Sequence, residues 1–207
     1  RSDISYVRTI ITQGDSFKYF APVSEPSSSW KNLNFDDDSW LQGVSGFGYA
    51  DGDDATIVPN GTQSLYTRIK FNMSDIDNLV SLILDVDYDD GFVAYINGIE
   101  VARANINGTP PLFDAGTIVD HEAQMYDGGK PERFLIDNPD NVLIHGENIL
   151  TIQLHNISTT SSDLTLIPFL SAVFSAPTSL GIDPPDILGL TNGNLHTNFK
   201  ISSKSET

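Results

Sequence analysis

Hydrophobic and polar residues alternate along much of the chain. In residues 64–72, Leu65 and Ile69 fall on one face of an extended chain, whereas Arg68 falls on the other. In residues 79–88, apolar side chains again occupy every second position, and aspartates stand between them. Because side chains of a β-strand point to opposite faces in turn, this period of two predicts two half-buried strands.

A β-hairpin is expected directly after the second of these segments. The runs FVAYI and IEVARAN are rich in β-branched and aromatic residues, and Asn97 and Gly98 join them. Both linking residues accept the positive φ of a type I′ turn, which makes this pair a strong hairpin signal. Further strand-like segments lie at residues 5–11, 17–21, 132–137, 148–156 and 164–174, with Gly146 and Glu147 as a turn before the fourth.

These roughly nine short strands, without a convincing helical period, predict an all-β fold, an antiparallel sandwich or barrel. Long connections rich in Gly, Asp and Pro interrupt the strands at residues 22–34, 43–63 and 109–131. Such connections gather at the ends of a sandwich, where binding sites usually lie.

The composition changes after Phe174. The following segment is rich in Pro, Gly and Ser, which cannot extend a central strand and are typical of a linker. We therefore expect one domain at residues 1–174, a linker at 175–190 and a tail at 191–207.

The chain is strongly acidic, with 28 Asp and Glu against 11 Lys and Arg and a net charge of −17. This charge excludes a basic nucleic-acid-binding surface. Aspartate accounts for 22 of the 28 acidic residues, and aspartate favours turns and oxygen-ligand loops over helices. The chain has no cysteine, so calcium is the metal that its composition favours. The apolar runs are shorter than the roughly 20 residues that span a membrane, so we expect no membrane insertion.

Two aspartate-rich loops, at residues 36–38 and 51–54, are candidates for a calcium site. Crowded carboxylates repel one another unless water or a cation lies between them. Two solvated acidic turns would explain the same residues about equally well. For Asp85 and Asp87 we expect cross-strand pairing with Arg68 and Lys70, and we expect residues 89–91 to form a turn.

Aromatic residues in or beside the long loops are candidates for sugar contacts. An exposed ring stacks on the apolar face of a pyranose, while neighbouring carboxylates and amides bind its hydroxyls. The alternative is that Trp40 and Tyr49 close the ends of the sandwich as core residues. The rings in question are Trp30, Trp40, Phe47, Tyr49 and Tyr126.

The sequence does not favour an enzyme. It contains no HExxH or GxSxG motif, and its four histidines are scattered. None of its many aspartates stands in the apolar surroundings that would raise the pKa of a general acid for glycoside hydrolysis.

Several segments, in this order, resemble the galactose-binding-like jelly-roll modules of secreted bacterial multidomain proteins. They are FDDDSW, GFGYADGDD, SLYTRIKF, DYDDGFVAYINGIEVARAN, HGENILTIQLHN and SSDL. The last two long segments are also similar to the sugar-binding domain of some glycoside hydrolases. The tail segment LHTNFKISSKSE looks like the start of a lamin-tail-like immunoglobulin domain.

The resemblance implies a jelly-roll sandwich that is a non-catalytic appendage and often holds a structural calcium ion. In relatives with a metal, an N-terminal loop and the last strand meet at the ion. Arg103 and Asn105 match recurrent polar positions, together with His155 and Asn156, although such residues equally bond loops together. The resemblance nominates as metal ligands Asp36, Asp38, Asp51, Asp53 and Asp163.

Our hypothesis from the sequence is a non-catalytic carbohydrate-binding module of a secreted or cell-surface protein, with polysaccharide and neighbouring domains as partners. The alternative is a structural or adhesive spacer without a small ligand. The candidate ligand contacts are Trp30, Tyr49, Arg103, Asn105 and Tyr126.

Overall fold

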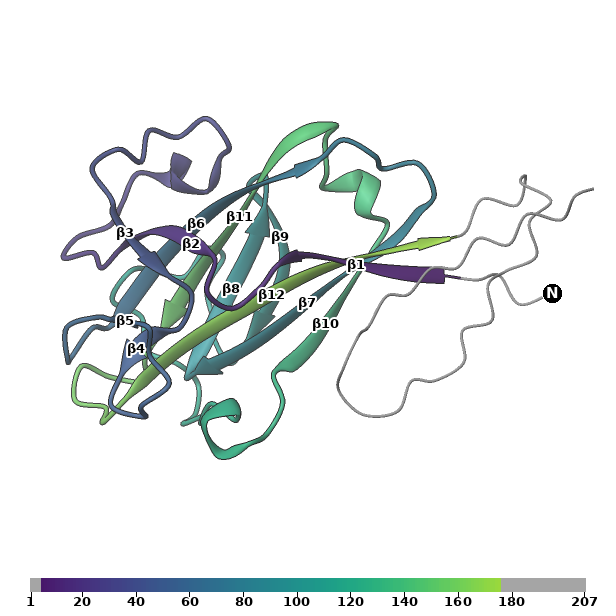
Figure 1. Ribbon diagram of the computed structural model, residues 1–207. Helices are drawn as coiled ribbons and strands as arrows, with labels where there is room; N and C mark the ends of the chain where they lie inside the picture. Colours follow the sequence, from purple (N-terminus) through teal and green to yellow (C-terminus); the bar gives the residue numbers. More distant parts are fainter. Residues whose placement is uncertain (1–4, 176–207) are drawn as a thin grey trace, which may run out of the picture. The chain divides into compact units, whose positions relative to one another are not determined.

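The computed structural model describes residues 5–175, which form two six-stranded β-sheets (Figure 1). The strands are β1 (Ser5–Ile11), β2 (Ser16–Phe20), β3 (Leu41–Val44), β4 (Phe47–Tyr49), β5 (Thr56–Ile57), β6 (Ser64–Met73), β7 (Leu79–Asp89), β8 (Gly91–Ile96), β9 (Ile99–Ala104), β10 (Glu132–Asp137), β11 (Gly146–His155) and β12 (Leu164–Ser175). Three short 3-10 helices lie in the connections: η1 (Ser28–Lys31), η2 (Met125–Asp127) and η3 (Pro139–Asn141).

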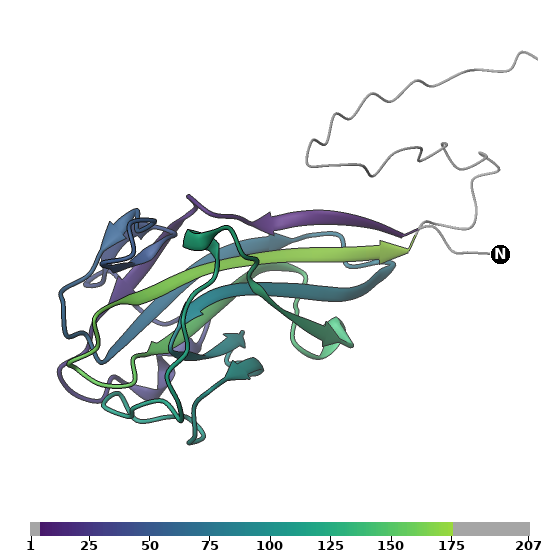
Figure 2. The ribbon, with the colours of Figure 1, turned by 90° about the horizontal axis from the view of Figure 1, so that it is seen from below.

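The first sheet has the strand order β10-β7-β12-β4-β5, and β1 also pairs with β12. The second sheet has the order β3-β2-β6-β11-β8-β9. All pairs are antiparallel except the short parallel pair of β4 and β5. Figure 2 shows β12, in light green, beside β7 along one layer. The fold is therefore the antiparallel jelly-roll β-sandwich that the sequence predicts.

The hydrophobic core lies between the two sheets. From the first sheet, Leu82, Leu84 and Val86 are fully buried at alternate positions of β7, and Leu150 and Ile152 of β11 are buried in the same cluster. Burying each such side chain contributes about 1.5–3 kcal/mol. The period of two in the sequence is thus the signature of this core.

The predicted hairpin is confirmed. Asn97 and Gly98 join β8 to β9 with φ values of 51° and 84°, as a type I′ turn requires. The side chain of Asn97 also donates hydrogen bonds to the Val142 carbonyl (2.8 Å) and to Asn148 Oδ1 (2.7 Å). This turn therefore fixes the register of the hairpin. It also ties the hairpin to β11 and to the loop that precedes β11.

Most of the predicted strands are present. The segment predicted as a loop at residues 43–63 contains β4, β5 and the end of β3, and none of these three short strands was predicted. The prediction of a turn at Gly146 and Glu147 was wrong, because both residues belong to β11 and pair with Met73 and Asn72 of β6. Gly146 has a φ of 92°, which explains its turn-like signal.

The expected pairing of Asp85 and Asp87 with Arg68 and Lys70 was also wrong. β6 belongs to the second sheet and β7 to the first, so these strands do not pair. Asp85 instead forms an ion pair with Arg133 of β10 (2.8 Å). The expected turn at residues 89–91 is a buried link in which the chain passes from one sheet to the other.

Arg68 is buried and holds the loop that covers the outer face of β6. Its guanidinium forms an ion pair with Asp37 (2.7 Å) and donates hydrogen bonds to the carbonyls of Trp30, Asn32 and Phe35. A second apolar cluster, which is mostly aromatic, packs near this guanidinium. It is formed by Trp30, Trp40, Tyr66, Val93, Tyr95 and Ile106.

The predicted linker at residues 175–190 and tail at 191–207 lie outside the described residues, apart from Ser175, which ends β12. Within residues 5–175, no helix is long and apolar enough to cross a membrane.

Candidate functional site

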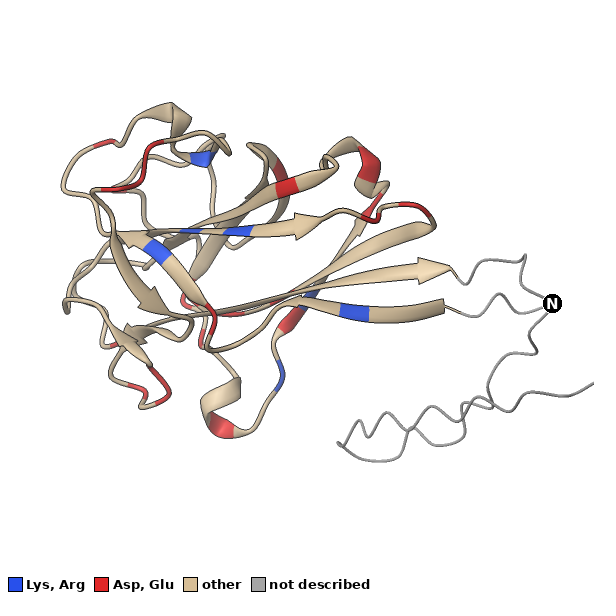
Figure 3. Ribbon diagram, turned by 45° about the horizontal axis from the view of Figure 1, so that its top comes forward, with Lys and Arg blue, Asp and Glu red and all other residues tan. Residues whose placement is uncertain are grey.

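Many acidic residues lie in the loops at the strand ends, and several others lie on strands such as β7 and β10 (Figure 3). One of these loops joins β4 to β5. Gly48 of β4 lies just before this loop, and any β-carbon there would collide with the Leu164 carbonyl and with Asp54 Oδ1. Glycine at this position therefore lets the loop fold against the start of β12 and brings its carboxylates together.

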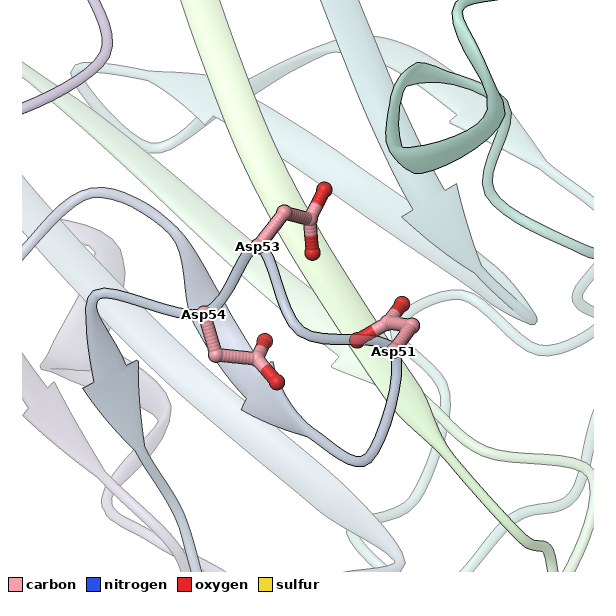
Figure 4. Close-up of side chains that lie close together, drawn as sticks. All are labelled: Asp51, Asp53 and Asp54. Carbon is pink, nitrogen blue, oxygen red and sulfur yellow. The ribbon is translucent and has the colours of Figure 1, made fainter.

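Within this loop, Asp51, Asp53 and Asp54 form a first acidic cluster (Figure 4). One carboxylate oxygen from each lies within 4.8 Å of the others. Five buried oxygens have no hydrogen-bond partner: Asp51 Oδ1 and both carboxylate oxygens of Asp53 and of Asp54. The other oxygen of Asp51 accepts a hydrogen bond from the hydroxyl of Thr165 in β12.

Burial and mutual repulsion change the acidity of the first cluster. Desolvation and the neighbouring Asp51 raise the pKa of Asp54 to about 7. The same two causes raise the pKa of Asp53. Buried carboxylates without donors are costly in the charged state, so this loop needs either protons or a cation.

A second acidic cluster consists of Asp89, Glu122 and Asp163, again with ligand atoms within 4.8 Å of one another. Asp89 ends β7 and is only 3% exposed, and its Oδ1 is buried without a hydrogen-bond partner. Desolvation and the charges of Asp90, Asp163 and Glu122 raise the pKa of Asp89 to about 8. Desolvation and nearby acidic groups also raise the pKa of Glu122.

The predicted metal ligands divide among three places. Asp51 and Asp53 come together as expected, and their partner Asp54 lies in the same candidate loop, although it was not among the nominated ligands. Asp163 lies in the second cluster, not with them. Asp36 and Asp38 belong to neither cluster: both are exposed, and Asp36 Oδ1 accepts a hydrogen bond from the Asp38 backbone (3.1 Å). The five nominated residues therefore do not form a single cluster.

Four of the five rings considered for sugar contacts are buried, as the alternative of core residues predicts for Trp40 and Tyr49. The expectation of exposure was wrong for the two buried rings chosen as ligand contacts, Trp30 and Tyr49. Trp30 is 3% exposed and packs edge-on against Tyr66 and Tyr95. Tyr49 is 3% exposed, and its hydroxyl accepts a hydrogen bond from Asn156 Nδ2 (3.1 Å). Trp30 belongs to the second apolar cluster and Tyr49 to the core between the sheets, so both rings stabilise the fold by their burial.

Arg103 and Asn105 hold loops together. Arg103 forms an ion pair with Glu100 (2.6 Å) and donates to the Gly108 carbonyl (2.8 Å). Asn105 donates to the Asp90 and Val119 carbonyls (2.9 and 2.6 Å). Tyr126, on η2, differs from the other candidates because its side chain is 49% exposed.

The sequence analysis missed Asp89 and Glu122, and it named Asp54 only as part of the loop at residues 51–54. The expectation that no aspartate has surroundings that raise its pKa was also wrong, because desolvation raises the pKa of both Asp54 and Asp89. The available signal was the adjacency of Asp89 and Asp90 at the end of an apolar strand. Glu122 gave none, because nothing in its own segment shows that it lies near Asp163.

The fold has relatives among solved structures. The β-glucuronidase of Bacteroides uniformis matches with a TM-score of 0.51 and 14% identity over 82% of this chain and 18% of that chain. A β-glucuronidase from an uncultured Clostridium sp. matches with a TM-score of 0.52 and 11% identity over 84% and 30% of the two chains. The β-glucuronidase of Bifidobacterium dentium, solved with coumarin-3-O-glucuronide, matches with a TM-score of 0.52 and 10% identity over 85% of this chain and 31% of that chain.

This chain therefore spans less than a third of the length of each of these glycosidases. At such low identity, the likeness shows the fold, an all-β sandwich that also occurs as one part of larger carbohydrate-acting enzymes. No protein-family model and no curated protein sequence matches the chain.

Proposed function

We propose that this domain is a non-catalytic, galactose-binding-like carbohydrate-binding module of a secreted or cell-surface multidomain protein, stabilised by calcium. The fold supports this proposal, because the same sandwich occurs as a part of β-glucuronidases, whose names describe action on sugars. The observation that carries the calcium part is the set of five buried, unpartnered oxygens in the first acidic cluster.

Calcium suits the first cluster chemically. The ion takes six to eight oxygen ligands at about 2.3–2.6 Å, so two oxygens on one ion lie at most roughly 5 Å apart. The oxygens of Asp51, Asp53 and Asp54 meet this condition, since they lie within 4.8 Å of one another. A bound ion would remove the repulsion that raises the pKa of Asp54.

A non-catalytic role agrees with the burial of the acidic groups. Asp89 has the raised pKa of a general acid, but its side chain is 3% exposed, so a sugar ring cannot reach it while a small cation can. His155 is fully buried, and its Nδ1–H donates to the Ala115 carbonyl (2.9 Å). This bond occupies Nδ1, and the burial keeps the ring from contact with a substrate.

The candidate sugar contact is the exposed ring of Tyr126. Desolvation and the charges of Glu122, Asp127 and Asp163 raise the pKa of its hydroxyl. An aromatic face beside carboxylates is suited to a pyranose, which stacks on the ring and donates its hydroxyls to the acids.

Affinity electrophoresis on a panel of polysaccharides, repeated with calcium and with chelator, tests the proposal. We expect retention on at least one polysaccharide, and we expect Tyr126→Ala to abolish it. Tyr6→Ala is the matched control, because Tyr6 is 48% exposed but lies on β1. Retention that is unchanged in Tyr126→Ala would place the sugar elsewhere, and no retention on any polysaccharide would refute carbohydrate binding.

The burial of Trp30 and Tyr49 favours a second candidate, a structural or adhesive spacer, because it removes two of the three rings expected to bind sugar. A spacer predicts a melting temperature that no sugar changes, together with tight contact to a neighbouring domain. A glycan-dependent rise in melting temperature would exclude it.

A further inference from the structure

We propose that the second acidic cluster, Asp89, Glu122 and Asp163, is a calcium site separate from the one in the first cluster. One oxygen of each residue lies within 4.8 Å of the others, as ligands of a single calcium ion must. The independent observation is Asp89: its side chain is 3% exposed, and its Oδ1 is buried without any hydrogen-bond partner.

The backbone around the second cluster holds its ligands in place. Asp90 Oδ1 accepts a hydrogen bond from the His121 amide (2.7 Å), and Asp90 Oδ2 accepts one from the Ile157 amide (2.6 Å). Asp87 accepts bonds from the Gln124 and Met125 amides (2.8 and 2.9 Å). Glu122 therefore lies between two anchored points of its loop.

Asp90 also ties the segment before Asp163 to β7, through its bond to Ile157. Asp87 of β7 and Asp90, which directly follows β7, each accept two backbone hydrogen bonds and thus position the segments that carry the ligands. Asp89 lies between them in sequence, and its Oδ1 is left free for a metal ion.

The two clusters are neighbours but are built from different segments. The first comes from one short loop, whereas the second joins the end of β7, the loop before η2 and the loop between β11 and β12. Thr165 links them, because its hydroxyl donates to Asp51 and its backbone lies opposite Asp89 in the β12–β7 ladder.

The charges around the second cluster favour a bound cation. The charged groups that act most on Asp89 are all carboxylates: Asp90, Asp163, Glu122 and Asp51. Burial increases from exposed Glu122 through half-buried Asp163 to buried Asp89. A bound ion would therefore have protein oxygens on its inner side and water on its outer side, and it would fasten the loop that carries Tyr126.

Isothermal titration of the chelator-treated full chain with CaCl2 tests this site. We expect two calcium ions per chain for the unmodified protein and one for Asp89→Asn. We expect Asp53→Asn also to bind one ion, and the double variant to bind none. Glu122→Gln, which changes an exposed residue and leaves the fold intact, should weaken one of the two binding events by about tenfold or more. Asp127→Asn, an equal charge change in the same loop, is the control and should still bind two ions.

Calcium binding that Asp89→Asn leaves unchanged, whether one ion or two, would overturn the proposal, whereas a single ion lost only in Asp89→Asn would count against the first cluster instead. One ion lost equally in Asp53→Asn and Asp89→Asn would also overturn it, because the two clusters would then share one site. Melting in chelator shows that the variants are folded: Asp89→Asn removes a buried charge and should melt at or above the temperature of the unmodified protein.

Discussion

At the scale of single residues, His155 illustrates how burial fixes a protonation state. It is fully buried at the end of β11, where its Nδ1–H donates to the Ala115 carbonyl and its Nε2 has no partner. Desolvation lowers the pKa of His155 to about 4. The folded protein thus contains the neutral ring, whereas the unfolded chain takes up a proton near the ordinary value of about 6.5.

We therefore expect His155 to make the protein less stable as the pH falls. Between pH 6.5 and pH 4 the unfolded state binds a proton that the folded state refuses, so the free energy of unfolding drops, by up to about 3 kcal/mol at the acidic end. Above pH 6.5 the ring is neutral in both states and contributes no pH dependence.

His155→Asn tests this expectation, because an amide can keep the bond to Ala115 but does not titrate. Urea denaturation of both proteins at pH 6.5 and pH 4.5, in saturating calcium, gives the difference in slope. The variant should lose much less stability on acidification than the unmodified protein. Equal losses would mean that other groups cause the pH dependence.

At the scale of structural elements, the loop around η1 depends on one buried ion pair. Arg68 of β6 is 1% exposed, binds Asp37 and donates to three backbone carbonyls of this loop. Its guanidinium also lies over the ring of Phe35 (5.0 Å). The loop therefore packs on β6 only while this guanidinium is present.

Arg68→Met should cost about 3–5 kcal/mol of the free energy of unfolding, because it leaves Asp37 and the carbonyls without their donor. Arg133→Met is the control: it breaks an ion pair in which Arg133 is 67% exposed, and such pairs contribute at most about 1 kcal/mol. Urea denaturation measures both. Adding Asp37→Asn to Arg68→Met should restore part of the loss, and equal effects of the two arginine variants would contradict this account.

The elements also show how far the sequence determines the structure. Long strands with a clear period of two, such as β7 and β12, were predicted because alternate burial leaves a direct record in the residue pattern. The strands β4 and β5 are three and two residues long and lie in a segment rich in Gly and Asp, so they have no such record.

The candidate site follows the same rule. Asp51 and Asp53 were predicted because the ligands of the first cluster are close in sequence. Asp89 and Glu122 were missed because only the fold brings their segments to Asp163. The aromatic residues misled for another reason. Trp30 lies in a loop that folds back on β6, and Tyr49, beside a long loop in the sequence, lies on β4 with its ring in the core between the sheets.

At the scale of the whole molecule, the excess of acidic groups sets the conditions for stability. The net charge is −17. The described residues include two clusters of three carboxylates, and within each cluster one oxygen of each residue lies within 4.8 Å of the others. General repulsion between surface charges is screened by any salt, since the Debye length is about 10 Å at 0.1 M. A buried cluster is screened much less, so only a bound cation relieves it.

This difference predicts separate responses to sodium and to calcium. Raising NaCl from 20 to 150 mM should increase the melting temperature modestly through screening. At 150 mM NaCl, calcium at 100 times its dissociation constant should add about 2.7 kcal/mol per site, or roughly 5–10 °C for a domain of this size. The increase follows because calcium binds the folded clusters and not the unfolded chain.

Differential scanning calorimetry in chelator, in NaCl alone and in NaCl with calcium measures the change in melting temperature that each ion causes. The variant Asp53→Asn with Asp89→Asn is the control, because it keeps most of the surface charge and so the response to NaCl, but should lose the response to calcium. If calcium raises the melting temperature of this variant as much as that of the unmodified protein, the ion acts on the surface as a whole and neither cluster is its site.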